Sequence, residues 1–141
     1  MLTVFILNTI IVTVAVLIHY EFLYRISTII PKMKIKHRFR IVIGVFTSLV
    51  AHSLEIWLFA ITYYLLQQMQ GWGYLGGAYH GTLMECAYFS FTTFTTLGLG
   101  DIEPHGHIRY LVGLESLTGL LLITWTASFL YYEMQRYWDK H

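Results

Sequence analysis

Charged residues are scarce in this chain of 141 residues: Asp, Glu, Lys and Arg make up only 12% of it, whereas 56% is hydrophobic. Soluble domains carry about a quarter charged residues, so this composition argues against a soluble protein. The formal net charge of +1 offers no basic surface for nucleic acid. Cysteine occurs once, at Cys86, which excludes an intrachain disulfide framework and a Cys-x-x-Cys metal site. We therefore expect an integral membrane protein.

Three long apolar segments account for most of the hydrophobic residues, and each is long enough to cross about 30 Å of hydrocarbon. They predict an N-terminal transmembrane helix over 1–24 and further helices over 41–67 and 109–132. A secretory signal peptide is the competing interpretation of the first segment. It is disfavoured because no positive charge precedes the apolar run and no A-x-A-like site follows it.

Positive charge is concentrated between the first two segments, where residues 25–40 are predicted to form a basic loop. This loop holds six of the nine Lys and Arg residues, namely Arg25, Lys32, Lys34, Lys36, Arg38 and Arg40. The positive-inside rule places this loop and the tail 133–141 in the cytoplasm and the N-terminus outside. The last five of these residues are candidates to bind anionic lipid, at about 1 kcal/mol each. A loop that only sets the topology is the alternative.

A glycine-rich stretch and a short amphipathic segment separate the second and third apolar segments. Residues 68–81 contain five glycines and predict an external turret. Residues 82–94 are too short to span a membrane, which favours a re-entrant helix. Thr82 and Glu85 have the spacing of a capping box at its start. The negative end of the helix dipole would point toward the membrane interior and favour a cation there.

Residues 95–101 read Thr-Thr-Leu-Gly-Leu-Gly-Asp, in which two glycines alternate with two leucines. Glycine adopts backbone angles that other residues resist, so this alternation lets successive carbonyl groups point to the same side. Carbonyl oxygens from several chains can then replace the hydration shell of a cation. Irregular backbone at membrane depth is tolerated only where it lines a cavity or is buried in protein.

This stretch resembles the pore signature of the potassium channel superfamily, T-T-V-G-Y-G-D, at five of seven positions. Leu97 replaces Val and Leu99 replaces Tyr. In having leucine at position 99, the stretch is similar to one pore loop of some two-pore-domain potassium channels. The resemblance implies that K⁺, and no organic cofactor, is bound by the Thr96 hydroxyl and by the carbonyls of Thr96, Leu97, Gly98, Leu99 and Gly100.

The resemblance also implies a set of residues that support this selectivity filter: Thr95, Asp101, Tyr88, Phe89 and Glu115. Tyr88 and Phe89 fall where the family has a pair of Trp residues, and Tyr88 is the best candidate to bond Asp101. We expect Glu115 to lie behind the filter and to bond pore-helix groups; the alternative is that it faces the ion cavity. Gly119 matches the position of the glycine hinge in the inner helix.

His52 and Glu55 lie within the second apolar segment, three residues apart and so on one helical face. Ionisable side chains at membrane depth are costly and seldom face lipid. We expect a buried polar pair that bonds across helices. A proton-sensing pair, or a haem or metal site that includes His19, is the alternative.

Together these features predict an all-α membrane protein with three transmembrane helices, a re-entrant pore helix and a filter loop. The resemblance implies a homotetramer that carries K⁺ passively across the cell membrane through a central pore within 41–132. A weakly selective Na⁺/K⁺ channel is the alternative, and a haem- or quinone-linked redox protein using His19 and His52 is a further one. The residue pattern contains no Ser/His/Asp or Cys/His arrangement, so we expect no enzymatic activity.

Overall fold

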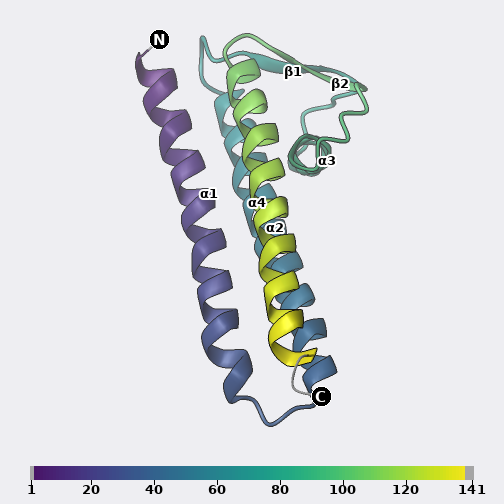
Figure 1. The fold of residues 1–141 in the computed structure, drawn as a ribbon. Helices are drawn as coiled ribbons and strands as arrows, with labels where there is room; N and C mark the ends of the chain where they lie inside the picture. The colour runs from purple at the N-terminus through teal and green to yellow at the C-terminus, as the bar shows by residue number, and fades with distance from the viewer. Residues whose placement is uncertain (1, 139–141) are drawn as a thin grey trace.

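Three long helices run side by side along the molecule in a computed structural model that describes residues 2–138 (Figure 1). They are α1 (Leu2–Ile29), α2 (His37–Leu66) and α4 (Ile108–Trp138). Within the described residues, these three helices are the ones long and apolar enough to cross a membrane. The number of spans predicted from the apolar segments is therefore confirmed.

The connection between α1 and α2 is much shorter than the predicted basic loop. Residues 25–29 belong to α1, a 3₁₀ turn η1 covers Ile30–Lys32, and α2 has already begun at His37. The prediction of a loop over 25–40 was therefore wrong. Lys and Arg have high helix propensity, so a run of positive charges does not by itself end a helix. Instead, α1 ends next to Pro31, which lies in the 3₁₀ turn that follows it. For the same reason α4 continues to Trp138, although a tail was predicted from 133.

Two short strands pair in the region predicted as turret and filter exit. β1 (Tyr74–Gly77) runs antiparallel to β2 (Ile102–His105), with Tyr74 opposite His105 and Gly77 opposite Ile102. The turret predicted over 68–81 did not include this strand pairing. Glycine-rich residues carry little strand propensity, and pairing partners this far apart in the chain leave no local pattern.

Gly77 shows why glycine is needed where the two strands meet. Its φ is +76°, and a Cβ added there would lie 2.4 Å from the carbonyl oxygen of Asp101. The backbone N–H of Ala78 donates a hydrogen bond to that same carbonyl, at 2.8 Å. The sheet thus holds the residue that ends the 95–101 stretch.

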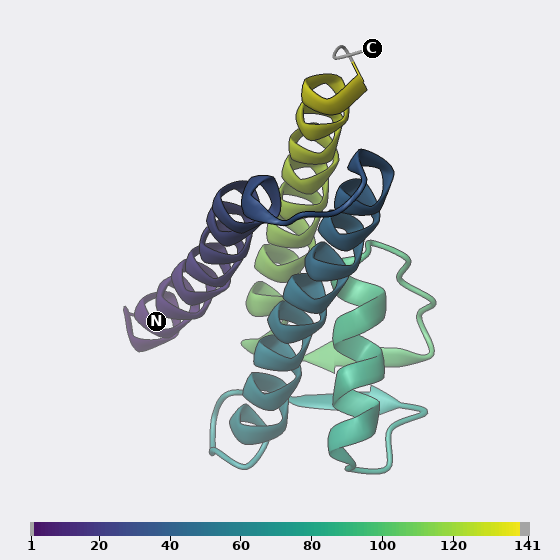
Figure 2. The same ribbon diagram turned by 90° about the horizontal axis from the view of Figure 1, so that it is seen from below.

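α3 (Leu83–Phe94) is a short helix that packs against α2 and α4 at the same end of the molecule as the sheet (Figure 2). The predicted capping box is confirmed: the Glu85 N–H donates to the Thr82 hydroxyl at 3.2 Å, and the Thr82 N–H donates to the Glu85 carboxylate at 3.0 Å. With 12 residues, α3 cannot span a bilayer.

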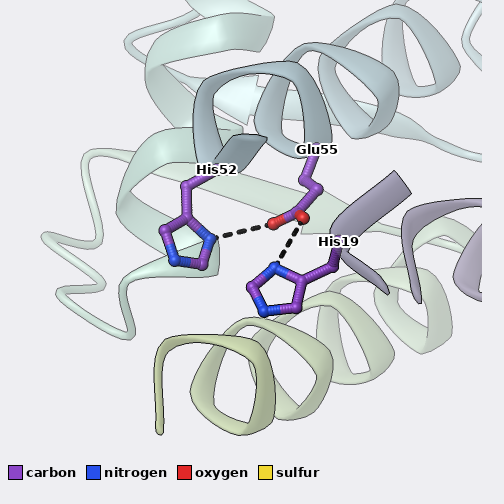
Figure 3. A group of neighbouring side chains, drawn as sticks. All are labelled: His19, His52 and Glu55. Carbon is purple, nitrogen blue, oxygen red and sulfur yellow. Dashed lines mark hydrogen bonds and ion pairs between the residues drawn. The ribbon is translucent and has the colours of Figure 1, made fainter. Parts of the chain in front are cut away.

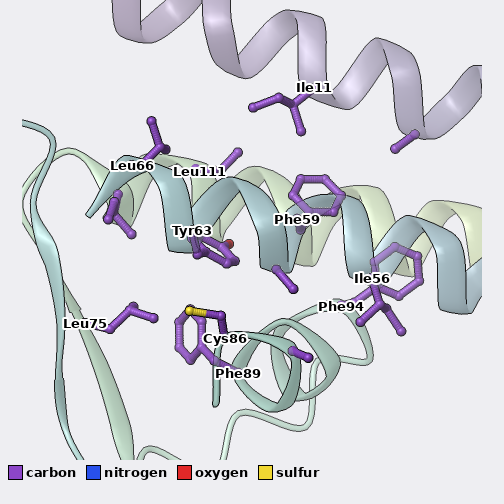
Figure 4. Packing of buried hydrophobic residues seen from close by; sticks show 14 of the residues in the cluster. Ile11, Ile56, Phe59, Tyr63, Leu66, Leu75, Cys86, Phe89, Phe94 and Leu111 are labelled. Carbon is purple, nitrogen blue, oxygen red and sulfur yellow. The ribbon is translucent and has the colours of Figure 1, made fainter. Parts of the chain in front are cut away.

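The main hydrophobic core lies between α2, α3 and α4 near this end (Figure 4). Phe59 and Tyr63 of α2 are fully buried there, and the rings of Tyr63 and Phe89 pack edge to face at 5.3 Å between centroids. α1 joins this core through Ile11 and Ala15. At the opposite end of the bundle, a smaller cluster of Leu23, Ile26 and Ile30 holds α1 against the other long helices.

The two ends of the bundle differ in what they carry. The first turn of α1 and the sheet lie at one end, whereas η1 and the last turns of α4 lie at the other (Figure 1). Most of the Lys and Arg residues therefore gather at the end away from the sheet.

Lowering the pH should weaken the N-terminal cap of α3 between about pH 4.5 and about pH 2. A hydrogen bond from the Thr82 backbone, and after it one from the His80 side chain, lowers the pKa of Glu85 from 4.5 to about 2. A carboxyl group with a lowered pKa contributes stability that is complete above pH 4.5 and is lost as the pH falls through about 2. We expect the thermal unfolding midpoint of the detergent-solubilised protein to fall over this range.

Glu85→Gln is the control because glutamine can also close a capping box but does not titrate. The unfolding midpoint of the variant should lie below that of the native protein at pH 7, and the two should converge as the pH approaches 2. A gap between them that stays constant with pH would contradict this account of Glu85.

Candidate functional site

The backbone of residues 95–101, which follows directly on α3, adopts an alternating conformation. Thr96, Gly98 and Gly100 have positive φ values of 60°, 54° and 77°. Among the described residues, Thr96 is the only one other than glycine with a positive φ. This left-handed conformation costs about 1–3 kcal/mol in such a residue and persists only when neighbouring structure holds it. Every second residue is therefore left-handed, which turns successive carbonyl groups toward the same side.

Hydrogen bonds to the end of α3 hold this loop in place. The Thr96 N–H donates to the carbonyl of Thr93 at 3.0 Å, and the Gly98 N–H donates to the carbonyl of Thr92 at 3.1 Å. The other side of the loop is open: residues 95–101 are all exposed, and a Cβ added at Gly98 or Gly100 would meet nothing within 4 Å. One face of the loop is thus tied to α3, and the other is free to meet an ion or another chain.

Tyr88 and Asp101 join the start and the end of this region. The Tyr88 hydroxyl donates a hydrogen bond to Asp101 Oδ2 at 2.9 Å, which is the contact predicted from the sequence. This bond raises the pKa of Tyr88 above its usual value, because the Asp101 carboxylate accepts the phenolic hydrogen. Phe89 is buried, packs edge to face against Tyr63 of α2, and also lines a hollow together with Thr96, Gly98 and Gly100 of the loop.

Glu115 of α4 is fully buried behind α3. Its two carboxyl oxygens accept hydrogen bonds from the hydroxyls of Ser90 in α3 and Tyr63 in α2, both at 2.5 Å. This is the expected bond to the pore helix, and within this chain the side chain does not face outward. A single carboxyl group therefore connects three helices.

Gly119 of α4 lies directly against the last residue of α3. A Cβ at this position would be 2.1 Å from the carbonyl oxygen of Phe94, so α4 approaches α3 as closely as glycine allows. The structure thus gives Gly119 a packing role at the base of the loop. Its role as a hinge stays a prediction.

Three contacts around the loop carried no signal in the sequence. Ser90 and Tyr63 are ordinary helix residues until Glu115 meets both of them. The hydroxyl of Ser116 in α4 donates to the Thr93 carbonyl at 3.2 Å. Residues of this kind could be predicted only with knowledge of which helix faces pack together.

The predicted polar pair on α2 is present, and His19 of α1 joins it (Figure 3). His52 Nδ1 lies 2.9 Å from Glu55 Oε2, and His19 Nδ1 lies 3.0 Å from Glu55 Oε1. His19 and Glu55 are fully buried. The pair therefore does bond across helices. The two imidazole centroids are 5.2 Å apart and share one carboxylate, which leaves no space for a haem plane between them.

The candidate lipid-binding residues lie around η1 and the start of α2. Lys32 ends η1, and Lys34 and Lys36 lie in the connection that follows. Arg40 donates a hydrogen bond to the Met33 carbonyl at 2.9 Å, so this side chain helps to fold the connection.

The fold and the loop define a class of protein: a multi-pass membrane protein in which two spans flank a short helix and a non-helical loop. A family model described as "Ion channel" matches residues 51–136, which is more than half of the chain. The chain belongs to this ion channel family, whose domain is that of two-transmembrane-type potassium channels. Its domain therefore serves passive ion transport.

The family match begins within α2, so α1 lies outside it. No curated protein and no solved structure is significantly similar to the chain.

Replacing Gly119 by alanine should destabilise the protein by about 1–3 kcal/mol, because the added methyl group overlaps the Phe94 carbonyl. Gly113→Ala is the matched control in the same helix, where an added Cβ meets nothing within 4 Å. There alanine should be neutral or stabilise by up to about 1 kcal/mol through its helix propensity. Thermal unfolding in detergent measures both. Equal effects of the two substitutions would show that close packing at Gly119 is unimportant.

Proposed function

We propose that four copies of this chain surround a central pore and that K⁺ crosses the membrane between their four 95–101 loops. The single observation that carries this proposal is the left-handed backbone at Thr96, Gly98 and Gly100 on a loop whose outer side is open. Such alternation lines up carbonyl oxygens, which can replace the water around a dehydrated cation.

The number of chains follows from the number of oxygens that an ion needs. One loop offers one carbonyl at each level, whereas K⁺ needs several. α3 and α4 also expose large apolar side chains near the loop, among them Phe91 at 53% and Leu121 at 61%. In a four-fold assembly these side chains would contact neighbouring copies. α3 would then be a re-entrant pore helix with its negative end toward the ions.

The supporting residues follow from the contacts already described. Glu115, Ser90 and Tyr63 hold α3 between α2 and α4. The bond between Tyr88 and Asp101 fixes the outer end of the loop, and the Thr96 hydroxyl would serve as the innermost ligand. Gly119 sets how closely α4 supports the loop. Bending at this residue would open the cytoplasmic side.

A weakly selective Na⁺/K⁺ channel is the second candidate, and Leu99 favours it. Leu97 and Leu99 line an apolar hollow with Tyr88 and Phe91 on the side of α3. Leucine can pack there but has no hydroxyl to bond, so the loop is held less firmly than by a tyrosine. A less firmly held loop discriminates less well between ions of different size.

The distribution of charge supports the orientation of the chain. The basic end, with Lys32, Lys34, Lys36, Arg38 and Arg40, would lie at the cytoplasmic leaflet, and the sheet would lie outside. These residues would bind anionic lipid there. The N-terminus would then be external and the end of α4 cytoplasmic.

Ion flux through the protein reconstituted in liposomes tests the proposal. We expect reversal potentials that follow the K⁺ gradient, and Leu99→Tyr should increase the preference for K⁺ over Na⁺. Leu17→Tyr on α1, where the leucine is 59% exposed, is the control and should leave ion preference unchanged. Gly98→Ala should abolish flux because alanine resists a φ of +54°.

Three outcomes would decide against parts of this account. A reversal potential that does not shift when K⁺ and Na⁺ are exchanged would favour the weakly selective channel. Unchanged selectivity and Ba²⁺ block in Leu99→Tyr would refute the role given to Leu99. A monomeric protein by native mass spectrometry, or one without flux, would refute the central pore.

A further inference from the structure

A buried polar cluster lies between α1 and the two other long helices. It consists of His19, His52, Glu55 and the hydroxyl of Thr126 in α4. Both imidazoles direct Nδ1 toward the Glu55 carboxylate (Figure 3). Both direct Nε2 toward Thr126 Oγ1, at 3.0 Å from His52 and 3.3 Å from His19. Ionisable groups inside a membrane are costly, so such a cluster calls for a function.

We propose that His19, His52 and Glu55 bind one divalent transition-metal cation, of the Zn²⁺ type. Imidazole nitrogen and carboxylate oxygen are the ligands that such ions take in proteins. One ligand atom from each of the three residues lies within 4.8 Å of the others. In a tetrahedral zinc shell with bonds of about 2.0–2.1 Å, neighbouring ligand atoms are about 3.3 Å apart. His19 Nδ1 lies 3.0 Å from Glu55 Oε1 and His52 Nδ1 lies 2.9 Å from Glu55 Oε2, so each nitrogen is close to this separation from one of the two carboxylate oxygens.

With both imidazoles neutral, the cluster without a metal is one hydrogen short of filling its contacts. Four nitrogen–oxygen contacts close the ring, but two neutral imidazoles and one hydroxyl supply only three hydrogens when Glu55 is ionised. With a cation on the two Nδ1 atoms, each imidazole carries its hydrogen on Nε2. Both then donate to Thr126 Oγ1, which has two lone pairs. Thr126 would thus orient both ligands, as outer partners of metal-bound histidines do.

The surroundings favour a positive charge at this point. The ring of His52 packs against that of Phe94, the last residue of α3, at 5.7 Å between centroids. The Trp125 ring packs against His19 at 5.1 Å and restricts its rotation. Glu55 adds a full negative charge when ionised. A cation would therefore offset charge that is otherwise uncompensated in a medium of low dielectric constant.

The cluster is reachable from one side. The His52 side chain is 14% exposed and lines a cavity of about 410 Å³ together with Thr126. A water or another small ligand could occupy the fourth metal position from this cavity. The bound ion would join α1, which lies outside the family match, to α2 inside it. The metal would therefore fasten the additional helix to the channel domain.

Direct metal binding to the full-length protein in detergent tests this proposal without measuring ion flux. After chelator treatment and dialysis, Co²⁺ should bind at one ion per chain and give visible d–d absorption bands. Zn²⁺ should abolish these bands and raise the thermal unfolding midpoint. Thr126→Val keeps all three ligands and should weaken Co²⁺ binding by roughly 10–100-fold.

His52→Gln should abolish the Co²⁺ bands, whereas the double substitution of His105→Gln, at the end of β2, and His107→Gln, just before α4, should leave them unchanged. The native protein is itself the decisive sample, so a variant that fails to fold does not spoil the test. Absence of Co²⁺ bands in the native protein would overturn the proposal and leave a cluster held by hydrogen bonds alone. The proposal would also be overturned if the Co²⁺ bands survived in His52→Gln, or if they vanished in the double variant of His105 and His107.

Discussion

The carboxyl group of Glu115 is the interaction on which the arrangement of this protein depends. A short helix such as α3 cannot cross the membrane and cannot hold its own position there. Glu115 connects it to the bundle by accepting hydrogen bonds from Ser90 of α3 and Tyr63 of α2. Buried polar groups that are fully bonded select one packing among many, because every alternative leaves a costly unpaired group. The position of α3 in turn decides where the 95–101 loop lies.

The loop itself illustrates how a strained backbone is maintained. Thr96 adopts a left-handed conformation, and the bonds to Thr93 and Thr92 keep it there. From the other end, Asp101 is held by Tyr88 and by the strand pairing at Gly77. The strain at Thr96 is therefore supported by α3 on one side and by the sheet on the other. This double support leaves carbonyl groups exposed that would otherwise be paired.

The helix outside the family match is attached by a different kind of contact. α1 presents a stripe of buried residues to the bundle, and most of its other side chains are exposed. Small and aliphatic residues make up most of that stripe, but His19 provides its one ionisable contact. Membrane helices gain little from hydrophobic burial against each other, so polar contacts have a larger part in their association. The cluster of His19, His52 and Glu55 thus holds α1 in register with α2.

The three spans, the start of α3 at its capping box and the alternation of glycine in the loop could all be predicted from the chain alone. These features depend on residues close together in the chain, where hydrophobicity, capping and glycine act locally. The sequence also pointed to Tyr88 with Asp101 and to Glu115, through resemblance to a known pore signature. The helical ends at residues 25–29 and 133–138 were missed, because charge was taken as a sign of loop.

Contacts between distant segments could not be predicted in this way, because they depend on how the helices pack. The pairing of β1 with β2, the meeting of Ser90 and Tyr63 at Glu115, and the place of Thr126 beside His19 and His52 all join residues from separate elements. Nothing in the local pattern marks these residues, since a serine or threonine in a helix usually bonds its own backbone. Their role arises from the angle and register at which the helices pack, which the whole set of buried side chains decides together.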